Sequence, residues 1–186
     1  MAVSWDSLRT PRLLMRRWRD TDREPFAAMN ADPEVMRYFR ASLDRAGSDA
    51  FIERIERAFD RYGFGLWVLH AVETDQFLGF TGLYPMPEGE LPGSGGIEVG
   101  WRLARHAWGH GYATEAATVA LRVAFEEAGL AEVWSMTAVL NERSQAVMRR
   151  LGMAPHAYFE HPTLPPEHPL RPHVAYRLAA ARLARP

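Results

Sequence analysis

Two glycines ahead of a run of small residues are the most chemically informative feature of the sequence. They are Gly109 and Gly111, in the stretch IEVGWRLARHAWGHGYATEA that covers residues 97–116. The first part of this stretch has strand character, and helical periodicity starts at Gly111. Glycines at the start of a helix leave backbone N–H groups uncovered at the positive end of the helix dipole. The pattern favours a site for a phosphate or pyrophosphate, and the alternative is that the glycines only form a turn.

Two common phosphate-binding motifs are excluded. No Gly-Lys-Ser/Thr follows the glycines, and all 22 basic residues of the chain are arginine. The dinucleotide fingerprint lacks its third glycine and does not open a βαβ unit. No lysine side chain is therefore present to act as a Schiff-base former or as a catalytic base.

Composition limits the classes of function further. The chain has 186 residues, a net charge of −1 and no cysteine. Its length predicts one domain, and its charge argues against nucleic acid or a membrane surface as a partner. The lack of cysteine excludes disulfides, thiolate metal sites and a cysteine nucleophile. The first ten residues show no signal-peptide pattern and no segment is apolar enough to span a membrane, so we expect a cytoplasmic protein.

The elements that must position the glycines follow from hydrophobic periodicity. Helices are expected over residues 20–30, 35–39, 48–62, 111–129 and 142–151. Strands are expected over residues 12–18, 64–72, 77–84, 97–103, 131–139, 153–159 and 173–178. One face of the 111–129 helix is almost all alanine, so this helix can lie close to a sheet. The order predicts a mixed sheet covered by helices.

Several motifs together resemble one family. WGHGYATEA, the strand IEVGWRL before it and NERSQAVMRRLGM after it are similar to the GNAT superfamily of acetyl-CoA-dependent N-acetyltransferases, as are the opening TPRLLMRRWRDTD and the tail AYRL. The resemblance is strongest to the ribosomal-protein-alanine acetyltransferase type. It implies a single acetyltransferase domain over residues 1–186. It also implies an α+β (mixed α/β) fold, with a mostly antiparallel twisted sheet of about seven strands that is splayed at its central strands and flanked by helices.

The resemblance implies where acetyl-CoA binds. The backbone from Gly109 to Thr114 is expected to hold the pyrophosphate, and Trp108 stands where the family usually has Gln or Arg. The strand ending at Leu103 is expected to pair with the pantetheine arm, and Asn141 to bond the same region. The residues of this expected coenzyme site are Trp101, Arg102, Leu103, Trp108, Gly109, His110, Gly111, Tyr112, Ala113, Thr114, Asn141 and Ser144.

Glu98 is the best-placed carboxylate for removing a proton from an amine acceptor. An amine is mostly protonated at neutral pH, so its attack on a thioester needs a base. The alternative is that Glu98 is only an outward-facing strand residue. Gly100 is predicted to form a bulge that opens the coenzyme slot, and a backbone N–H near Trp101 is predicted to polarise the thioester carbonyl.

The residue that donates a proton to the leaving thiolate differs from the family pattern in this chain. Many members of the family use a tyrosine on the helix after Asn141, and this chain has Met148 at that position. Ser144 is the substitute that we predict. Its alternative role is local, because a small polar side chain is favoured in the first turn of a helix.

The other polar residues have simpler interpretations. Glu115 lies at a helix N-terminus, where acids are stabilising, and is expected to be structural. The prediction for Arg102, Arg105 and Arg143 is that they flank the coenzyme groove, either near its phosphates or in solvent. His106 and His110 lack a third ligand, so no metal is expected. The loop that carries His156, His161, His168 and His173 is expected to shape the choice of acceptor.

The resemblance therefore implies a transferase. An acetyl group would pass from acetyl-CoA to an amine, either a protein N-terminus or a small molecule, by direct attack in a ternary complex. Two alternatives remain open: a catalytically inactive acyl-CoA-binding module used for sensing or assembly, and a scaffold that binds no coenzyme. The sequence does not fix the oligomeric state, and a homodimer is compatible with it.

Overall fold

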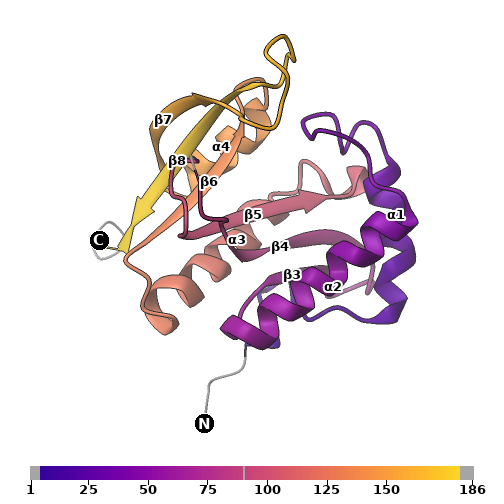
Figure 1. The fold of residues 1–186 in the computed structure, drawn as a ribbon. Coiled ribbons are helices and arrows are strands. Elements are labelled where there is room, and N and C mark those ends of the chain that lie inside the picture. The colour runs from indigo at the N-terminus through magenta and orange to yellow at the C-terminus, as the bar shows by residue number, and fades with distance from the viewer. Residues whose placement is uncertain (1–4, 90, 181–186) are drawn as a thin grey trace.

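Eight strands form one twisted sheet in the computed structural model, which describes residues 5–89 and 91–180 (Figure 1). Their order across the sheet is β1-β2-β3-β4-β5-β6-β8-β7, and every neighbouring pair is antiparallel except β5 with β6. The mostly antiparallel mixed sheet is thus confirmed. The strands are β1 (Ser7–Arg9), β2 (Leu13–Arg16), β3 (Leu66–Ala71), β4 (Phe77–Pro85), β5 (Ile97–Leu103), β6 (Glu132–Ala138), β7 (Ala154–Glu160) and β8 (Pro172–Ala179).

One strand more is present than the seven expected. It is β1, which pairs with β2. Its three residues are too few to show a period of two, so the hydrophobic pattern does not predict it.

Four α-helices flank the sheet: α1 (Arg23–Ala31), α2 (Arg45–Tyr62), α3 (Tyr112–Arg122) and α4 (Glu142–Arg150). A 3-10 turn, Asp20–Asp22, precedes α1, and a π-helical turn, Val123–Glu127, extends α3. α2 begins one turn before the expected Ser48, because Asp44 caps it by accepting a hydrogen bond from the Gly47 backbone N–H. Gly63, in the left-handed conformation, ends α2 as predicted.

The helix expected over residues 35–39 is wrong. This segment is a series of turns in which Asp32 accepts from the backbone of Glu34 and of Met36. The turns bury Val35 and Met36 in the core and leave Phe39 partly exposed, whereas a helical turn would place these three residues on one face. The segment therefore serves as a loop over the sheet.

The helices cover the two faces of the sheet. α1 and α2 lie on one face, over β3 and β4, whereas α3 packs against β4 and β5 from the other (Figure 1). The middle of the alanine face, Ala116, Ala117, Ala120 and Ala124, is fully buried, which confirms the expected close packing of α3. Short side chains let the helix axis approach the strands, and this brings the first turn of α3 next to the end of β5.

The sheet is splayed between β5 and β6. The one residue pair joining these two strands, within the described chain, is Glu98 with Trp134, and beyond it they diverge. The predicted bulge at Gly100 is wrong, because Gly100 pairs with Gly82 in a regular ladder between β4 and β5. Divergence of two parallel strands, rather than a bulge, opens the slot.

No helix among residues 5–89 and 91–180 is long and apolar enough to cross a membrane. The expectation about the N-terminal signal partly concerns residues 1–4, which lie outside the described residues.

Candidate active site

A cleft of about 840 Å³ lies where β5 and β6 diverge. Its walls come from the end of β5, the glycine loop with the start of α3, the outward face of α4 and the 34–39 turns. Of the expected coenzyme residues, it is lined by Trp101, Arg102, Leu103, Trp108, Gly109, Gly111, Tyr112, Ala113, Thr114, Asn141 and Ser144. The cleft therefore gathers eleven of the twelve residues that the motif resemblance selects.

The glycine loop presents open backbone N–H groups to this cleft. Gly109 and Gly111 both have φ of 80°, and Gly111 is the N-cap residue of α3. The N–H groups of the first helical turn have no intrahelical acceptor, so they point toward any anion at this end of α3. A side chain at Gly109 would meet no atom within 4 Å, which leaves the cradle uncovered.

Arg12, the residue directly before β2, holds the glycine loop in place through hydrogen bonds. Its Nε donates to Glu115 Oε2 at 2.7 Å, and its Nη1 donates to the His110 carbonyl at 3.0 Å. Glu115 thus has the structural role expected for it, and its hydrogen bonds from Thr10 and Arg12 overcome the effect of burial and lower its pKa. His110 does not line the cleft; its ring stacks on Tyr112.

The main chain at the end of β5 faces the slot. At one end of the β4–β5 ladder the Ala104 N–H donates to the Leu78 carbonyl, and at the other end the Met86 N–H donates to the Gly96 carbonyl. These two bonds fix which residues of β5 form the hydrogen-bonded pairs with β4. Because hydrogen-bonded pairs alternate along an antiparallel ladder, the N–H groups of Trp101 and Leu103 point away from β4, toward the slot. This edge can pair with an extended, amide-bearing ligand.

Glu98 occupies the point where β5 and β6 still meet. It is partly buried and does not line the large cleft, and its carboxyl group has no hydrogen-bond partner among the described residues. Desolvation raises the pKa of its carboxyl group to about 7. A carboxylate that titrates near neutral pH suits a general base.

The start of α4 brings Asn141 and Ser144 together. Asn141 Oδ1 accepts from the Ser144 N–H at 3.2 Å, and its Nδ2 donates to Thr137 Oγ1 and Ser144 Oγ. The Ser144 hydroxyl hydrogen is therefore free for another acceptor. Met148 is buried, with 1% exposure, and does not reach the cleft.

The three arginines expected at the groove have different surroundings. Arg143 lies over the Trp108 ring at 4.8 Å, at the edge of the cleft. Arg105 pairs with Asp32 at 2.8 Å and does not line the cleft. Arg102 is buried and donates to Asn30 at 2.6 Å.

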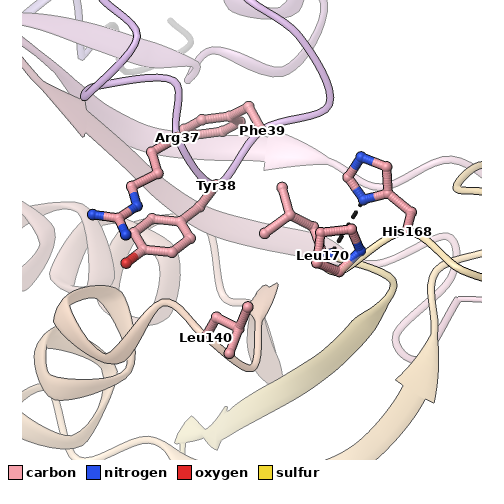
Figure 2. A pocket seen from close by; sticks show the side chains of 7 residues that line it. Arg37, Tyr38, Phe39, Leu140, His168 and Leu170 are labelled. Atoms are coloured by element: carbon pink, nitrogen blue, oxygen red, sulfur yellow. Dashed lines mark hydrogen bonds between the residues drawn. The ribbon is translucent and has the colours of Figure 1, made fainter.

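A smaller pocket of about 550 Å³ adjoins the cleft (Figure 2). Figure 2 shows Tyr38 and Phe39 facing Leu170 and His168 across it, with Leu140 below. His168 is held by the Leu170 N–H, which donates to Nδ1 at 3.1 Å. Of the residues that line this pocket, the sequence predicts a functional role only for His168, because the pocket is formed by three segments that are far apart in the chain.

The remaining histidines make no metal site. The ring centroids of His161 and His173 lie 4.7 Å apart with the ring planes tilted by 54°, and His156 packs edge-on against Trp134. Burial lowers the pKa of His161 and of His173, which favours neutral rings. Across the part of the chain that the structure describes, no group of three or more His, Cys, Asp or Glu could hold an ion.

A family sequence model for the acetyltransferase (GNAT) domain matches residues 12–154 of this chain, which include the glycine loop and the start of α4. The chain belongs to the GNAT acetyltransferase family.

Curated relatives agree with this membership. An uncharacterized protein, YkkB from Bacillus subtilis, is 30% identical over 145 residues, covering 77% of this chain and 83% of YkkB. The FsC-acetyl coenzyme A-N(2)-transacetylase of Aspergillus fumigatus is 35% identical over 153 residues, or 79% of this chain. This chain spans 64% of the length of that GNAT relative.

Solved structures show the same fold. A GNAT-family acetyltransferase from Bacillus anthracis superposes with a TM-score of 0.77 at 21% identity, covering 94% of this chain and 99% of its own. Spermidine N-acetyltransferase from Vibrio cholerae, in complex with CoA and spermine, gives a TM-score of 0.74 at 15% identity and covers 95% and 100%. The expected GNAT fold is thus confirmed.

Proposed function

We propose that this protein transfers an acetyl group from acetyl-CoA to an amine by direct attack in a ternary complex. The observation that carries the proposal is one continuous cleft that joins the exposed backbone edge of β5 to the glycine cradle of α3. The first would pair with the amide-bearing arm of the coenzyme, and the second would bind its pyrophosphate. The names of the Aspergillus and Vibrio relatives support an amine acceptor.

The proposed reaction uses three groups of this chain. Glu98 accepts a proton from the acceptor's ammonium group, directly or through water. The amine nitrogen then bonds to the thioester carbon while the Trp101 N–H stabilises the developing oxyanion. As the carbon–sulfur bond breaks, the Ser144 hydroxyl gives its proton to the thiolate and takes up the second proton of the attacking nitrogen, so that the products are the neutral amide and the free thiol and Ser144 is unchanged. No metal takes part in this proposal.

Calorimetric titration with acetyl-CoA, followed by thiol release with amines and N-terminal peptides, tests the proposal. Micromolar binding and amine-dependent thiol release are expected, and the chain has no cysteine to add background. Binding without thiol release would instead support the inactive acyl-CoA-binding module, and no binding at millimolar coenzyme would support the scaffold. The acceptor class and the narrower ribosomal-protein-alanine resemblance stay predictions.

A further inference from the structure

Arg102 is a buried cation without a carboxylate partner among the described residues. Its exposure is 9%, and its hydrogen bond is donated from Nη1 to Asn30 Oδ1, while Nε is buried with no acceptor. Arg16, which is also buried, instead pairs with Asp22 at 2.8 Å. A buried charge without a counter-charge is costly, so an unpaired one in a ligand cleft points to an anionic ligand group.

The position of Arg102 in β5 indicates which ligand would carry this anionic group. Side chains alternate along a strand, so Glu98, Gly100 and Arg102 share the face that α1 and α2 flank. A Cβ atom added at Gly100 would meet nothing within 4 Å. Open space therefore separates the proposed base from the buried cation, on one face of one strand.

The 34–39 turns border the space between Glu98 and Arg102. The Arg102 guanidinium lies 4.0 Å from the centroid of the Phe39 ring, and Phe39 also lines the smaller pocket. That pocket adds the apolar side chains of Leu140 and Leu170 (Figure 2). A ligand that spans Gly100 would thus meet a cation and an apolar pocket together.

The charges that line both spaces disfavour a polyamine. The cleft contains four arginines and one carboxylate, Glu34, and the smaller pocket contains Arg37 and His168 but no carboxylate. Ammonium groups beyond the reacting amine would have few acidic partners here. A carboxylate, in contrast, matches the planar donors of an arginine.

We propose that the acceptor is a small amine that carries a carboxylate close to the reacting nitrogen, as an apolar α-amino acid does. Arg102 binds the carboxylate, Glu98 faces the amine across Gly100, and the pocket of Phe39, Leu140 and Leu170 takes the apolar side chain. The volume of this pocket, about 550 Å³, is in the range of small-molecule sites. This inference rests on the proposed acetyltransferase function, and it deepens that function by naming the acceptor class.

A matched set of acceptors tests the inference in thiol-release assays: L-leucine, L-leucinamide, isoamylamine and spermidine. The wild type is expected to prefer leucine to leucinamide by about tenfold or more in kcat/KM, since a charge-assisted bond is lost with the amide. Arg102→Gln is expected to reduce this ratio to about one, mainly by lowering the rate with leucine. Arg105→Gln, a nearby arginine outside the cleft, should keep the preference.

Gly100→Ala is a second probe, which does not depend on the folding of the Arg102 variant. The added methyl group meets no protein atom, so the melting temperature should not fall. It occupies the proposed acceptor space, so the KM for leucine should rise several-fold while the Kd for acetyl-CoA, measured by calorimetry, is unchanged.

The outcomes separate the sources of the anion. Loss of coenzyme affinity in Arg102→Gln with an unchanged leucine preference would assign Arg102 to a coenzyme phosphate and overturn the inference. Equal rates with leucine, leucinamide and isoamylamine, or turnover of N-terminal peptides alone, would overturn it and leave the acetyltransferase function intact. Coenzyme binding without thiol release from any amine or peptide would overturn the proposed function itself.

Discussion

Glu98 and Asp22 are two carboxylates whose pKa values shift in opposite directions, although burial raises the pKa of both. Burial alone raises the pKa of Glu98 to about 7, because no cation or hydrogen-bond donor offsets it among the described residues. For Asp22, hydrogen bonds from His70 and Arg16 outweigh burial and lower the pKa well below its usual range. The first environment keeps a proton exchangeable near neutral pH, whereas the second fixes a charge.

Glu98→Gln is expected to lower kcat by about a hundredfold or more, the contribution typical of a general base. Because the base acts when deprotonated, the wild-type rate should rise with pH through an apparent pKa near 7, and this limb should vanish in the variant. Initial rates of thiol release from pH 5.5 to 8.5 measure both effects.

Glu132→Gln is the matched control, because Glu132 lies on the adjacent strand β6, partly exposed and paired with Arg177. It should leave the pH profile unchanged. Equal losses of turnover and of acetyl-CoA affinity in Glu98→Gln would contradict the assignment of Glu98 as the base.

Single residues of the site differ in how far the sequence predicts them. Gly109, Gly111 and Asn141 are predictable, because their roles depend on the backbone of their own segment. Tyr38 and Leu140 are not, because the pocket that they line exists only where the 34–39 turns, the start of α4 and the β7–β8 loop meet. Nothing local in the sequence specifies that meeting.

The glycine loop and α3 act as one element. The left-handed Gly111 turns the chain so that the first turn of α3 faces the cleft, while Glu115 on the same turn is held by Arg12. This arrangement separates the side of the helix that Arg12 anchors from the side that lines the cleft.

Gly111→Glu is expected to abolish acetyl-CoA binding, because it adds a negative charge beside the proposed pyrophosphate site. A Cβ atom there would also lie 3.7 Å from Arg12 Nη2, the side chain that holds Glu115. The change also strains a backbone with φ of 80°, at a cost of about 1–2 kcal/mol. Gly152→Glu is the matched control: it has φ of 79° and open surroundings, but caps the far end of α4. Calorimetry should show coenzyme binding lost in the first variant only, and retained binding in Gly111→Glu would refute the anion cradle.

Whole elements follow the sequence where their pattern is long enough. The β3–β4 hairpin, α2 and α3 carry many apolar positions at regular spacing and are confirmed within a few residues. The 35–39 segment fails because the signals for a cap and for proline at a helix start also fit a turn. Its tertiary contacts, such as Phe39 with Arg102, decide between the two.

At the scale of the molecule, a buried ion network joins β2, the Asp20–Asp22 turn and β3. Arg16 binds both oxygens of Asp22, at 2.8 and 3.0 Å, and His70 Nε2 lies 3.0 Å from the same carboxylate. His70 Nδ1 meets the Asp75 carbonyl at 2.8 Å, so each ring nitrogen has an acceptor, although Nε2 also lies 3.0 Å from Arg16 Nη2, whose charge opposes protonation of the ring. Burial opposes the charged ring, but these bonds outweigh it and raise the pKa of His70.

Asp22→Asn is expected to lower the free energy of unfolding by about 3 kcal/mol, because it leaves Arg16 buried and unpaired. Because folding raises the pKa of His70, the charged ring stabilises the folded state. This stabilisation is complete below the pKa that His70 has in the unfolded chain, and it is lost as the pH rises through the pKa in the folded protein. The difference between wild type and variant should therefore be larger at pH 5.5 than at pH 8.5. Urea unfolding at pH 5.5 and at pH 8.5 measures this difference in the free energy of unfolding. Asp20→Asn is the control, because Asp20 is exposed, and it should show no such dependence on pH. A difference between wild type and Asp22→Asn that does not change with pH would contradict the charged state of His70.

The divergence of β5 from β6 has a consequence for the protein without its ligand. From Trp101 onward, the slot-facing side of β5 carries N–H groups that no strand satisfies within the described chain, and Trp101 and Leu103 line the cleft at this edge. Such an edge is a template for the addition of strands from other molecules. Acetyl-CoA in the slot would thus protect the chain against aggregation, and the solubility of the purified protein is expected to depend on keeping the slot filled.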